Sequence, residues 1–270
     1  MLGAIIGDIV GSRFQFLYDR NRMKCITLFV PSCYITDDSL MTLAVADALL
    51  ISKCDPEILK TVVVDCMRKI GHKYPNTGFG ERFAEWLFDE PDPKPYNSYG
   101  NGSAMRVSSA GWLYDTLEET RHIARLTAEV THNHPEGIKG AETTASAIFL
   151  ARNGKSKSEI RDYIINEFGY DLSRTCDEIR PAYRHVETCQ QTVPEAITAF
   201  LEGNGFEDVI RTAVSLGGDC DTLTCIAGGI AEAYYGVPDK LKKECIKRLP
   251  ADMTKVLRKF EKKKYKENIN

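Results

Sequence analysis

The sequence predicts an all-α globular protein. Apolar residues recur at helical spacing over most of the 270 residues, as at Leu40, Leu43 and Leu50. Alternation of apolar and polar residues, which is typical of strands, is scarce. Glycine and proline residues separate the periodic segments, for example in the run from Pro91 to Pro95. Together these three observations favour helices joined by short turns.

Each expected helix combines this spacing with a boundary of turn-forming residues. One helix follows Asp38 and another follows Thr116. The others cover about residues 56–70, 80–88, 137–152, 157–168, 175–190, 194–202, 206–215, 221–235 and 238–263, the last broken near Pro250. No internal repeat and no low-complexity linker divides the chain, so we expect a single domain over residues 1–270.

The composition limits the classes of function. The formal net charge is −3 and the pI is about 6.0, which gives no sign of the basic surface that nucleic-acid binding requires. The start of the chain lacks the pattern of a signal peptide, and no segment approaches the roughly 18 apolar residues of a membrane span. Nine cysteines, an odd number without a CxxC pair, favour reduced thiols. We therefore expect a cytoplasmic protein, with a monomer as the default state.

The last part of the chain is basic, with seven Lys and Arg residues between Lys255 and Lys266. Such charges could bind an acidic partner. A solvated final helix is the simpler interpretation, because positive charge near a helix C-terminus suits the helix dipole.

Two segments about 180 residues apart in the sequence share one design. Carboxylates and a threonine stand at the start of an apolar helix in both: Thr36, Asp37 and Asp38 in the first, and Asp219, Asp221 and Thr222 in the second. Helix capping would explain one residue at each start, because Asp and Thr oxygens accept hydrogen bonds from the first free amides. Four aspartates exceed what two caps require, and burying them without cations would be costly.

Oxygen ligands of this kind suit Mg²⁺, Mn²⁺ or Ca²⁺. Two divalent cations would offset four carboxylates and leave positions open for water and substrate. Gly217 and Gly218 would allow a sharp turn that brings Asp219 close to the first cluster. The sequence thus indicates a metal site, with helix capping as the alternative.

Two further segments could contact an anionic ligand. The small and hydroxyl-bearing residues from Ser98 to Ser103 could present backbone amides to a pyrophosphate, although Gly-Asn-Gly is also an ordinary turn. His132 lies in a loop before the helix that Pro135 and Glu136 begin. It could contact a sugar or phosphate, or be a hydrogen-bonded loop histidine.

In this order and spacing, these segments resemble the ADP-ribosylglycohydrolase family. The resemblance begins at Gly3 and Asp8, includes the four segments, and covers roughly residues 1–238. It implies a compact, orthogonal all-α fold with a dinuclear Mg²⁺ or Mn²⁺ centre. It also implies an enzyme that hydrolyses the bond at the ribose anomeric carbon and releases ADP-ribose from a conjugate. Arginine-linked protein is slightly favoured over serine, nucleic-acid or small-molecule conjugates.

The resemblance implies roles for the matching residues. The metal ligands would be Thr36, Asp37, Asp38, Asp219, Asp221 and Thr222. The ADP-ribose would be held by Ser98, Tyr99, Gly100, Asn101, Gly102, Ser103 and His132, with Phe79 on the adenine side. Asp37 and Asp219 would be catalytic and relay protons.

One catalytic position departs from the family pattern. Many relatives carry a glutamate after the residues that match Gly11 and Ser12, where this chain has Gln15. An amide cannot accept a proton as a carboxylate does, and it carries no charge. Gln15 leaves open an enzyme with a different proton path, an ADP-ribose-binding protein without turnover, and an engineered substitution. A structural protein that reuses the fold is a further alternative.

Overall fold

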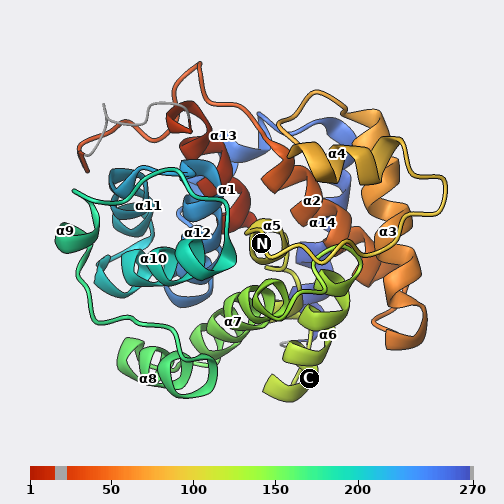
Figure 1. The fold of residues 1–270 in the computed structure, drawn as a ribbon. Helices are drawn as coiled ribbons and strands as arrows, with labels where there is room; N and C mark the ends of the chain where they lie inside the picture. Colours follow the sequence, from red (N-terminus) through yellow and green to blue (C-terminus); the bar gives the residue numbers. More distant parts are fainter. Residues whose placement is uncertain (16–22, 268–270) are drawn as a thin grey trace.

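The computed structural model describes residues 1–15 and 23–267, with side chains up to Lys264. This part of the chain holds fourteen α-helices and two short 3-10 helices but no β-strand, which confirms the all-α prediction (Figure 1). In chain order the helices are α1 (Leu2–Gly11), η1 (Ser12–Phe14), α2 (Asp37–Ile51), α3 (Pro56–Lys73), α4 (Glu81–Phe88), α5 (Gly102–Met105), η2 (Ala110–Trp112), α6 (Leu117–Glu129), α7 (Pro135–Arg152), α8 (Lys157–Phe168), α9 (Cys176–Ile179), α10 (Cys189–Glu202), α11 (Phe206–Leu216), α12 (Cys220–Tyr235), α13 (Asp239–Ile246) and α14 (Ala251–Glu267).

Helix α12 lies at the centre of the fold, where it packs against α1, α7, α10 and α11. Helix α1 is buried along its whole length and has its most extensive contact with α12. Gly3, Gly7 and Gly11 stand on one face of α1, four residues apart. A Cβ atom at Gly11 would lie 2.6 Å from the Cα of Asp221, so the absence of side chains lets the two backbones approach closely. The α1 helix was not among the helices expected from the sequence.

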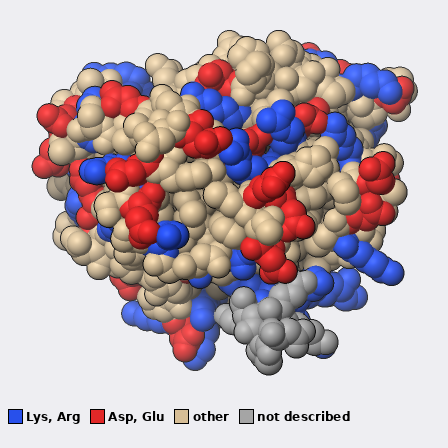
Figure 2. Space-filling model, turned by 90° about the horizontal axis from the view of Figure 1, so that it is seen from below, with Lys and Arg blue, Asp and Glu red and all other residues tan. Residues whose placement is uncertain are grey.

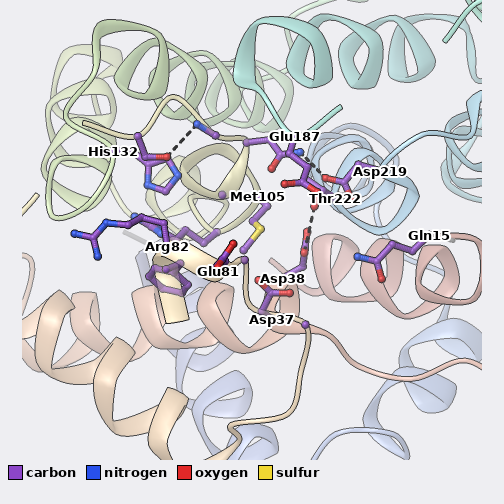
Figure 3. Close-up of a pocket in the computed structure, with 18 of the residues that line it drawn as sticks. Gln15, Asp37, Asp38, Glu81, Arg82, Met105, His132, Glu187, Asp219 and Thr222 are labelled. Carbon is purple, nitrogen blue, oxygen red and sulfur yellow. Dashed lines mark hydrogen bonds between the residues drawn. The ribbon is translucent and has the colours of Figure 1, made fainter. Parts of the chain in front are cut away.

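Helix α2 carries the first aspartate pair into the interior. Residues 38–46 of α2 are all buried, and the helix packs against α1, α3 and α14. Because α2 and α12 both begin at the same side of the core, the polar residues at their N-termini meet (Figure 3).

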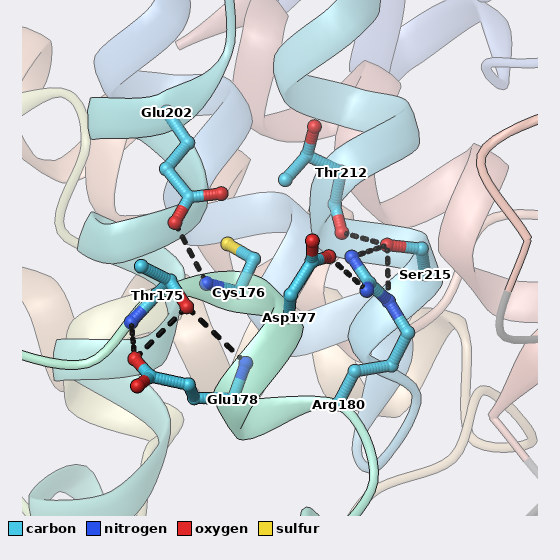
Figure 4. A network of polar contacts seen from close by, with 8 residues as sticks. All are labelled: Thr175, Cys176, Asp177, Glu178, Arg180, Glu202, Thr212 and Ser215. Atoms are coloured by element: carbon cyan, nitrogen blue, oxygen red, sulfur yellow. Dashed lines mark hydrogen bonds and ion pairs between the residues drawn. The ribbon is translucent and has the colours of Figure 1, made fainter.

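The predicted helix over residues 175–190 is wrong for most of its length. Only α9 and the first two residues of α10 are helical there, because α10 begins at Cys189 rather than at Pro194. Pro181 cannot donate the next helical hydrogen bond. The side chain of Arg180 donates to Ser215 and forms an ion pair with Asp177 (Figure 4). The following residues pair with another loop through an isolated antiparallel bridge between Gly100 and Thr188.

The basic C-terminal segment folds as α14, after a break at Pro250 that the sequence predicted. One side chain there departs from the expected exposure. Lys264 is only 6% exposed, and its Nζ lies 2.8 Å from Glu232 Oε1 and 3.4 Å from the centre of the Trp112 ring. The buried carboxylate of Glu232 explains why this lysine is drawn into the core.

Three observations bear on the chemistry of the chain. All nine cysteines are free thiols. On the face shown in Figure 2, acidic and basic side chains are interspersed. None of the described helices is both long enough and apolar enough to span a membrane.

Candidate active site

A pocket of about 260 Å³ opens between the N-termini of α2 and α12 and the loops before α4, α5 and α10 (Figure 3). In Figure 3, His132 lies at one side of the pocket and Gln15 at the other, with Asp38 between them. The pocket brings together ten of the residues that the sequence singled out: Gln15, Asp37, Asp38, Ser98, Gly100, Asn101, Gly102, His132, Asp219 and Thr222.

Thr36 explains how α2 begins. It has extended backbone angles, and its Oγ1 accepts a hydrogen bond from the amide of Asp38 at 3.2 Å. Capping is therefore real at this position, as the simpler interpretation expected. It uses the threonine and leaves the carboxylates of Asp37 and Asp38 for another purpose.

The start of α12 is formed by a turn that needs two glycines. Gly217 and Gly218 have φ values of +75° and +73°, which other residues rarely adopt. Asp219 follows as the N-cap residue but makes no side-chain capping bond; its Oδ2 instead accepts a hydrogen bond from Asn101 Nδ2 at 2.6 Å. The turn thus directs Asp219 towards the pocket and the Ser98–Ser103 loop.

A direct contact joins the two aspartate segments. Thr222 Oγ1 on α12 donates a hydrogen bond to Asp38 Oδ2 on α2 at 3.3 Å. Thr36 Oγ1 lies 3.4 Å from the same oxygen. Residues that are far apart in the sequence therefore form one group, which we call the acidic cluster: Asp37, Asp38, Asp219 and Asp221.

The acidic cluster lacks compensating charge. Burial, followed by the charges of Asp8 and Asp219, raises the pKa of Asp37 to about 8. The pKa values of Asp38 and Asp221 are raised well above the ordinary value, first by burial and then by neighbouring aspartates. No described Lys or Arg forms an ion pair with these three carboxyl groups.

Several oxygens of the cluster are without hydrogen bonds. Within residues 1–15 and 23–264, Asp38 Oδ1 and both carboxyl oxygens of Asp221 are buried and have no donor. Such groups are costly unless a cation or a proton satisfies them. Carboxylate and hydroxyl oxygens suit a hard divalent cation in kind.

The carboxyl groups of the acidic cluster lie further apart than the ligands of a bound metal ion. In the described part of the chain, no three His, Cys, Asp or Glu side chains are gathered closely enough to hold an ion by themselves. The candidate set also uses the hydroxyls of Thr36 and Thr222, and its aspartates would have to draw together around an ion.

Asp8 is a buried residue beside the pocket, and the sequence assigned it no role beyond the family resemblance. Its carboxylate accepts hydrogen bonds from the amide and hydroxyl of Thr36, at 3.1 and 2.7 Å, and from the amide and hydroxyl of Ser39. It therefore fixes the first turn of α2, although it lies on α1. One acid inside an otherwise apolar helix was the available signal, because a buried carboxylate needs partners.

The Ser98–Ser103 loop is already hydrogen-bonded in part. The amide of Gly100 donates to Ser98 Oγ at 3.1 Å, and the amide of Asn101 donates to the carbonyl oxygen of Glu187 at 2.9 Å. Gly102 and Ser103 begin α5, where amides have no partner within the helix, and of these two Gly102 lines the pocket.

Two residues of the same loop, Tyr99 and Ser103, do not line the pocket. The side chain of Tyr99 is 49% exposed, and its ring packs edge-on against His134. The side chain of Ser103 is fully buried and donates a hydrogen bond to the carbonyl oxygen of Gly137 at 2.7 Å.

Aromatic and basic residues form the wall near His132. Phe79 does not line the pocket; its ring contacts those of Phe83 and Phe88, while Phe83 itself reaches the pocket. Arg82 lies over the Tyr96 ring, 4.5 Å from its centre. Arg106, in the segment that resembles the family, also lines the pocket, although it is only 1% exposed.

Two glutamates add negative charge to the pocket. Glu81 begins α4, and Glu187 lies in the non-helical part of the segment that was predicted as a helix over 175–190. Neither was singled out from the sequence, because the position of Glu187 depends on the long-range pairing of its backbone with Asn101.

The structure combines an all-α fold with acidic residues in a pocket beside a glycine-containing loop, as the family resemblance implied. A family model for ADP-ribosylglycohydrolases matches residues 1–268. The chain belongs to the ADP-ribosylglycohydrolase family and is an enzyme, a hydrolase acting on glycosidic bonds.

Individual proteins agree with this assignment. ADP-ribosylhydrolase ARH3 of Homo sapiens is 28% identical, over 91% of this chain and 87% of that protein. ADP-ribosylarginine hydrolase Tri1 of Pseudomonas putida is 29% identical, over 88% of this chain and 70% of that protein. A solved ADP-ribosylglycohydrolase-related protein complex contains a chain with the same fold, with a TM-score of 0.71, 24% identity and 94% coverage of both chains. The single domain, the monomeric state and the cytoplasmic location stay predictions.

Proposed function

We propose that this enzyme requires Mg²⁺ or Mn²⁺ and releases ADP-ribose from a conjugate by hydrolysis at the ribose anomeric carbon. The observation that carries the proposal is the buried acidic cluster, in which α2 and α12 contribute carboxyl oxygens without hydrogen-bond donors. Two divalent cations would supply the missing positive charge.

The proposed roles follow the positions of the side chains. The two ions would be held by Thr36, Asp37, Asp38, Asp219, Asp221 and Thr222. They would supply Lewis acidity that favours water as a nucleophile near neutral pH. The loop from Ser98 to Gly102 would bind the diphosphate and adjoining ribose, and His132 would donate a hydrogen bond to the ligand. Asp37 and Asp219 would move protons at the metal side of the pocket.

We propose an arginine linkage as the preferred substrate. Glu81 and Glu187 line the pocket in addition to the aspartates, and carboxylates favour a cationic guanidinium. Tri1, a relative of similar identity to ARH3, is named as an ADP-ribosylarginine hydrolase. Serine and nucleic-acid linkages are the competing outcomes of the same experiment.

Release of ADP-ribose from arginine-linked and serine-linked peptides tests this proposal. Wild-type protein is expected to act faster on the arginine conjugate with Mg²⁺ or Mn²⁺, and to lose activity when EDTA removes the metal. Asp219→Asn is expected to lower kcat at least about 100-fold, as removal of a key charged group in an active site does. Asp65→Asn, at an exposed position on α3, is the matched control and should act as wild type. Equal activity with EDTA would contradict the metal requirement, and faster release from serine would contradict the substrate choice.

A second candidate is an ADP-ribose-binding protein that has lost turnover, and Gln15 in the pocket favours it. Calorimetry would then show tight binding of ADP-ribose, while no conjugate releases ADP-ribose in the presence of metal. Measurable turnover by wild-type protein would exclude this candidate.

A further inference from the structure

His132 lies with one ring nitrogen against the glycines of the Ser98–Ser103 loop. A Cβ atom at Gly102 would lie 3.2 Å from its Nε2, and one at Gly100 would lie 3.4 Å from the same nitrogen. His132 lines the pocket but is only 5% exposed. The two glycines therefore keep the space around Nε2 open to a ligand.

The opposite ring nitrogen is part of a buried hydrogen-bond chain. Arg106 Nη2 donates to Thr131 Oγ1 at 2.7 Å, and Thr131 Oγ1 lies 2.6 Å from His132 Nδ1. Arg106 is 1% exposed and Thr131 is fully buried. Because all three side chains are buried, water does not replace any partner in this hydrogen-bond chain.

The number of hydrogens that Arg106 and Thr131 can donate determines which tautomer of His132 is favoured. A guanidinium only donates, so Thr131 must accept from Arg106, and its single hydroxyl hydrogen is left for another acceptor. Among the described residues, His132 Nδ1 is the atom placed to accept this hydrogen. If Nδ1 carried a hydrogen instead, the buried hydroxyl hydrogen would lose its partner, which costs about 1–3 kcal/mol. The favoured tautomer therefore carries its hydrogen on Nε2.

The electrostatic environment keeps the ring neutral. Burial, and then the charge of Arg106, lowers the pKa of His132 well below its ordinary value. Burial lowers the pKa of Arg106 to about 10, so the guanidinium stays charged at neutral pH. No described carboxylate forms an ion pair with it, and its Nε has no hydrogen-bond partner there.

We propose that Arg106 is a positioning residue that, through Thr131, holds His132 as a neutral imidazole whose Nε2 hydrogen is directed at an anionic oxygen of the ligand. The buried charge of Arg106 also favours an anion on that side of the pocket. The inference rests on the proposed function only for the identity of the ligand, whose diphosphate would supply the oxygen.

NMR of histidine-labelled, ligand-free protein tests the tautomer without any assumption about substrate. Long-range ¹H–¹⁵N correlations at pH 7 are expected to show His132 protonated on Nε2 and unprotonated on Nδ1, with the signal assigned by its loss in His132→Gln. Thr131→Ser should keep this pattern. Thr131→Val and Arg106→Met should each give a mixture of tautomers, whereas Arg106→Lys, which still donates, should restore one. A ring protonated on Nδ1 in wild-type protein would overturn the inference.

Calorimetry with ADP-ribose tests the consequence for binding. Loss of a well-placed donor is worth roughly a tenfold increase in Kd, which is the effect expected for Thr131→Val, with Thr131→Ser close to wild type. Thermal unfolding identifies any variant that fails to fold. Wild-type binding that is unchanged in Thr131→Val, with an unchanged tautomer, contradicts the inference. Absence of ADP-ribose binding by wild-type protein contradicts the proposed ligand instead, and the tautomer result stands by itself.

Discussion

Gln15 is a neutral amide at the end of a pocket that three aspartate carboxyl groups also line, those of Asp37, Asp38 and Asp219. Gln15→Glu keeps the shape of the side chain and adds a group that can accept a proton. We expect kcat for ADP-ribose release to rise about tenfold or more, because general acid–base groups contribute roughly 10²–10⁴-fold. Steady-state kinetics with metal present measures this change.

Gln15→Ala separates proton transfer from contact with the substrate. If Gln15 only positions the substrate, Gln15→Ala should lower kcat/KM while Gln15→Glu gives no gain. That result would mean that the proton path of this enzyme runs through other groups, such as Asp37 or Asp219.

At the scale of single residues, the sequence predicted those site residues that stand at a recognisable helix start. Asp37 and Asp38 stand at a helix start that the apolar pattern reveals, and the structure places both in the pocket. Glu187 could not be found in this way, because it reaches the pocket only through pairing of its backbone with a distant loop. Asp8 was visible as an acid among apolar residues, but its partners on α2 depend on the tertiary fold.

The close packing of α1 on α12 depends on glycine. A Cβ atom at Gly7 would lie 2.8 Å from the amide nitrogen of Cys225 and closer still to the carbonyl oxygen of Thr224. Gly7→Ala is therefore expected to lower the free energy of unfolding by about 1–3 kcal/mol or more, since neither backbone can yield without moving a helix. Urea-induced unfolding measures the loss.

Gly205→Ala is the matched control for this substitution. Gly205 precedes α11, and a Cβ atom there would meet no other atom within 4 Å. Its effect should be within about 0.5 kcal/mol of zero. A similar loss in both variants would mean that the loss does not come from the close contact between α1 and α12, because the effect of alanine on the unfolded chain is stabilising.

Helices were predictable where the apolar pattern ended at turn-forming residues such as glycine, as for α8 and α11. The pattern over residues 175–190 was misleading because Pro181 interrupts it and the next residues gain hydrogen bonds elsewhere. Helix α1 was missed for a different reason: it is buried on all sides, and a helix without a polar face has little periodicity to detect.

At the scale of the whole molecule, a buried ion-pair network joins its beginning to its end. Glu232 on α12 accepts hydrogen bonds from the α-ammonium group of Met1 at 2.6 Å and from Lys264 on α14 at 2.8 Å. Burial alone would raise the pKa of Glu232, but these two cations lower it from 4.5 to about 2. Because the folded-state pKa is lowered, the contribution to stability is complete above about pH 4.5 and is lost as the pH falls towards 2.

Glu232→Gln is therefore expected to be less stable than wild type by about 3 kcal/mol at pH 7, and the gap should narrow as the pH falls below 4.5. Denaturant unfolding at several pH values measures the difference. Glu118→Gln, at an exposed position of α6, should show no comparable gap. A gap that is constant down to pH 2.5 would mean that Glu232 acts through packing and not through its charge.

The acidic cluster joins helices from opposite ends of the sequence, so ions bound there would stabilise the fold as a whole. An ion that binds only the folded state adds about 2.7 kcal/mol at 100 times its Kd. For a chain of this size that corresponds to a rise in Tm of about 5–10 °C. Differential scanning calorimetry with Mn²⁺ or Mg²⁺, compared with EDTA, measures it.

Asp221→Asn distinguishes the cluster from other cation sites. Both oxygens of Asp221 are buried without hydrogen bonds in the described structure, and neighbouring aspartates repel its charge. The variant is expected to be at least as stable as wild type in EDTA, because that repulsion is removed, and to lose most of the rise in Tm on adding metal. Asp65→Asn should keep the full rise. An equal rise in Asp221→Asn would mean that the metal stabilises the protein from a site outside the two aspartate segments.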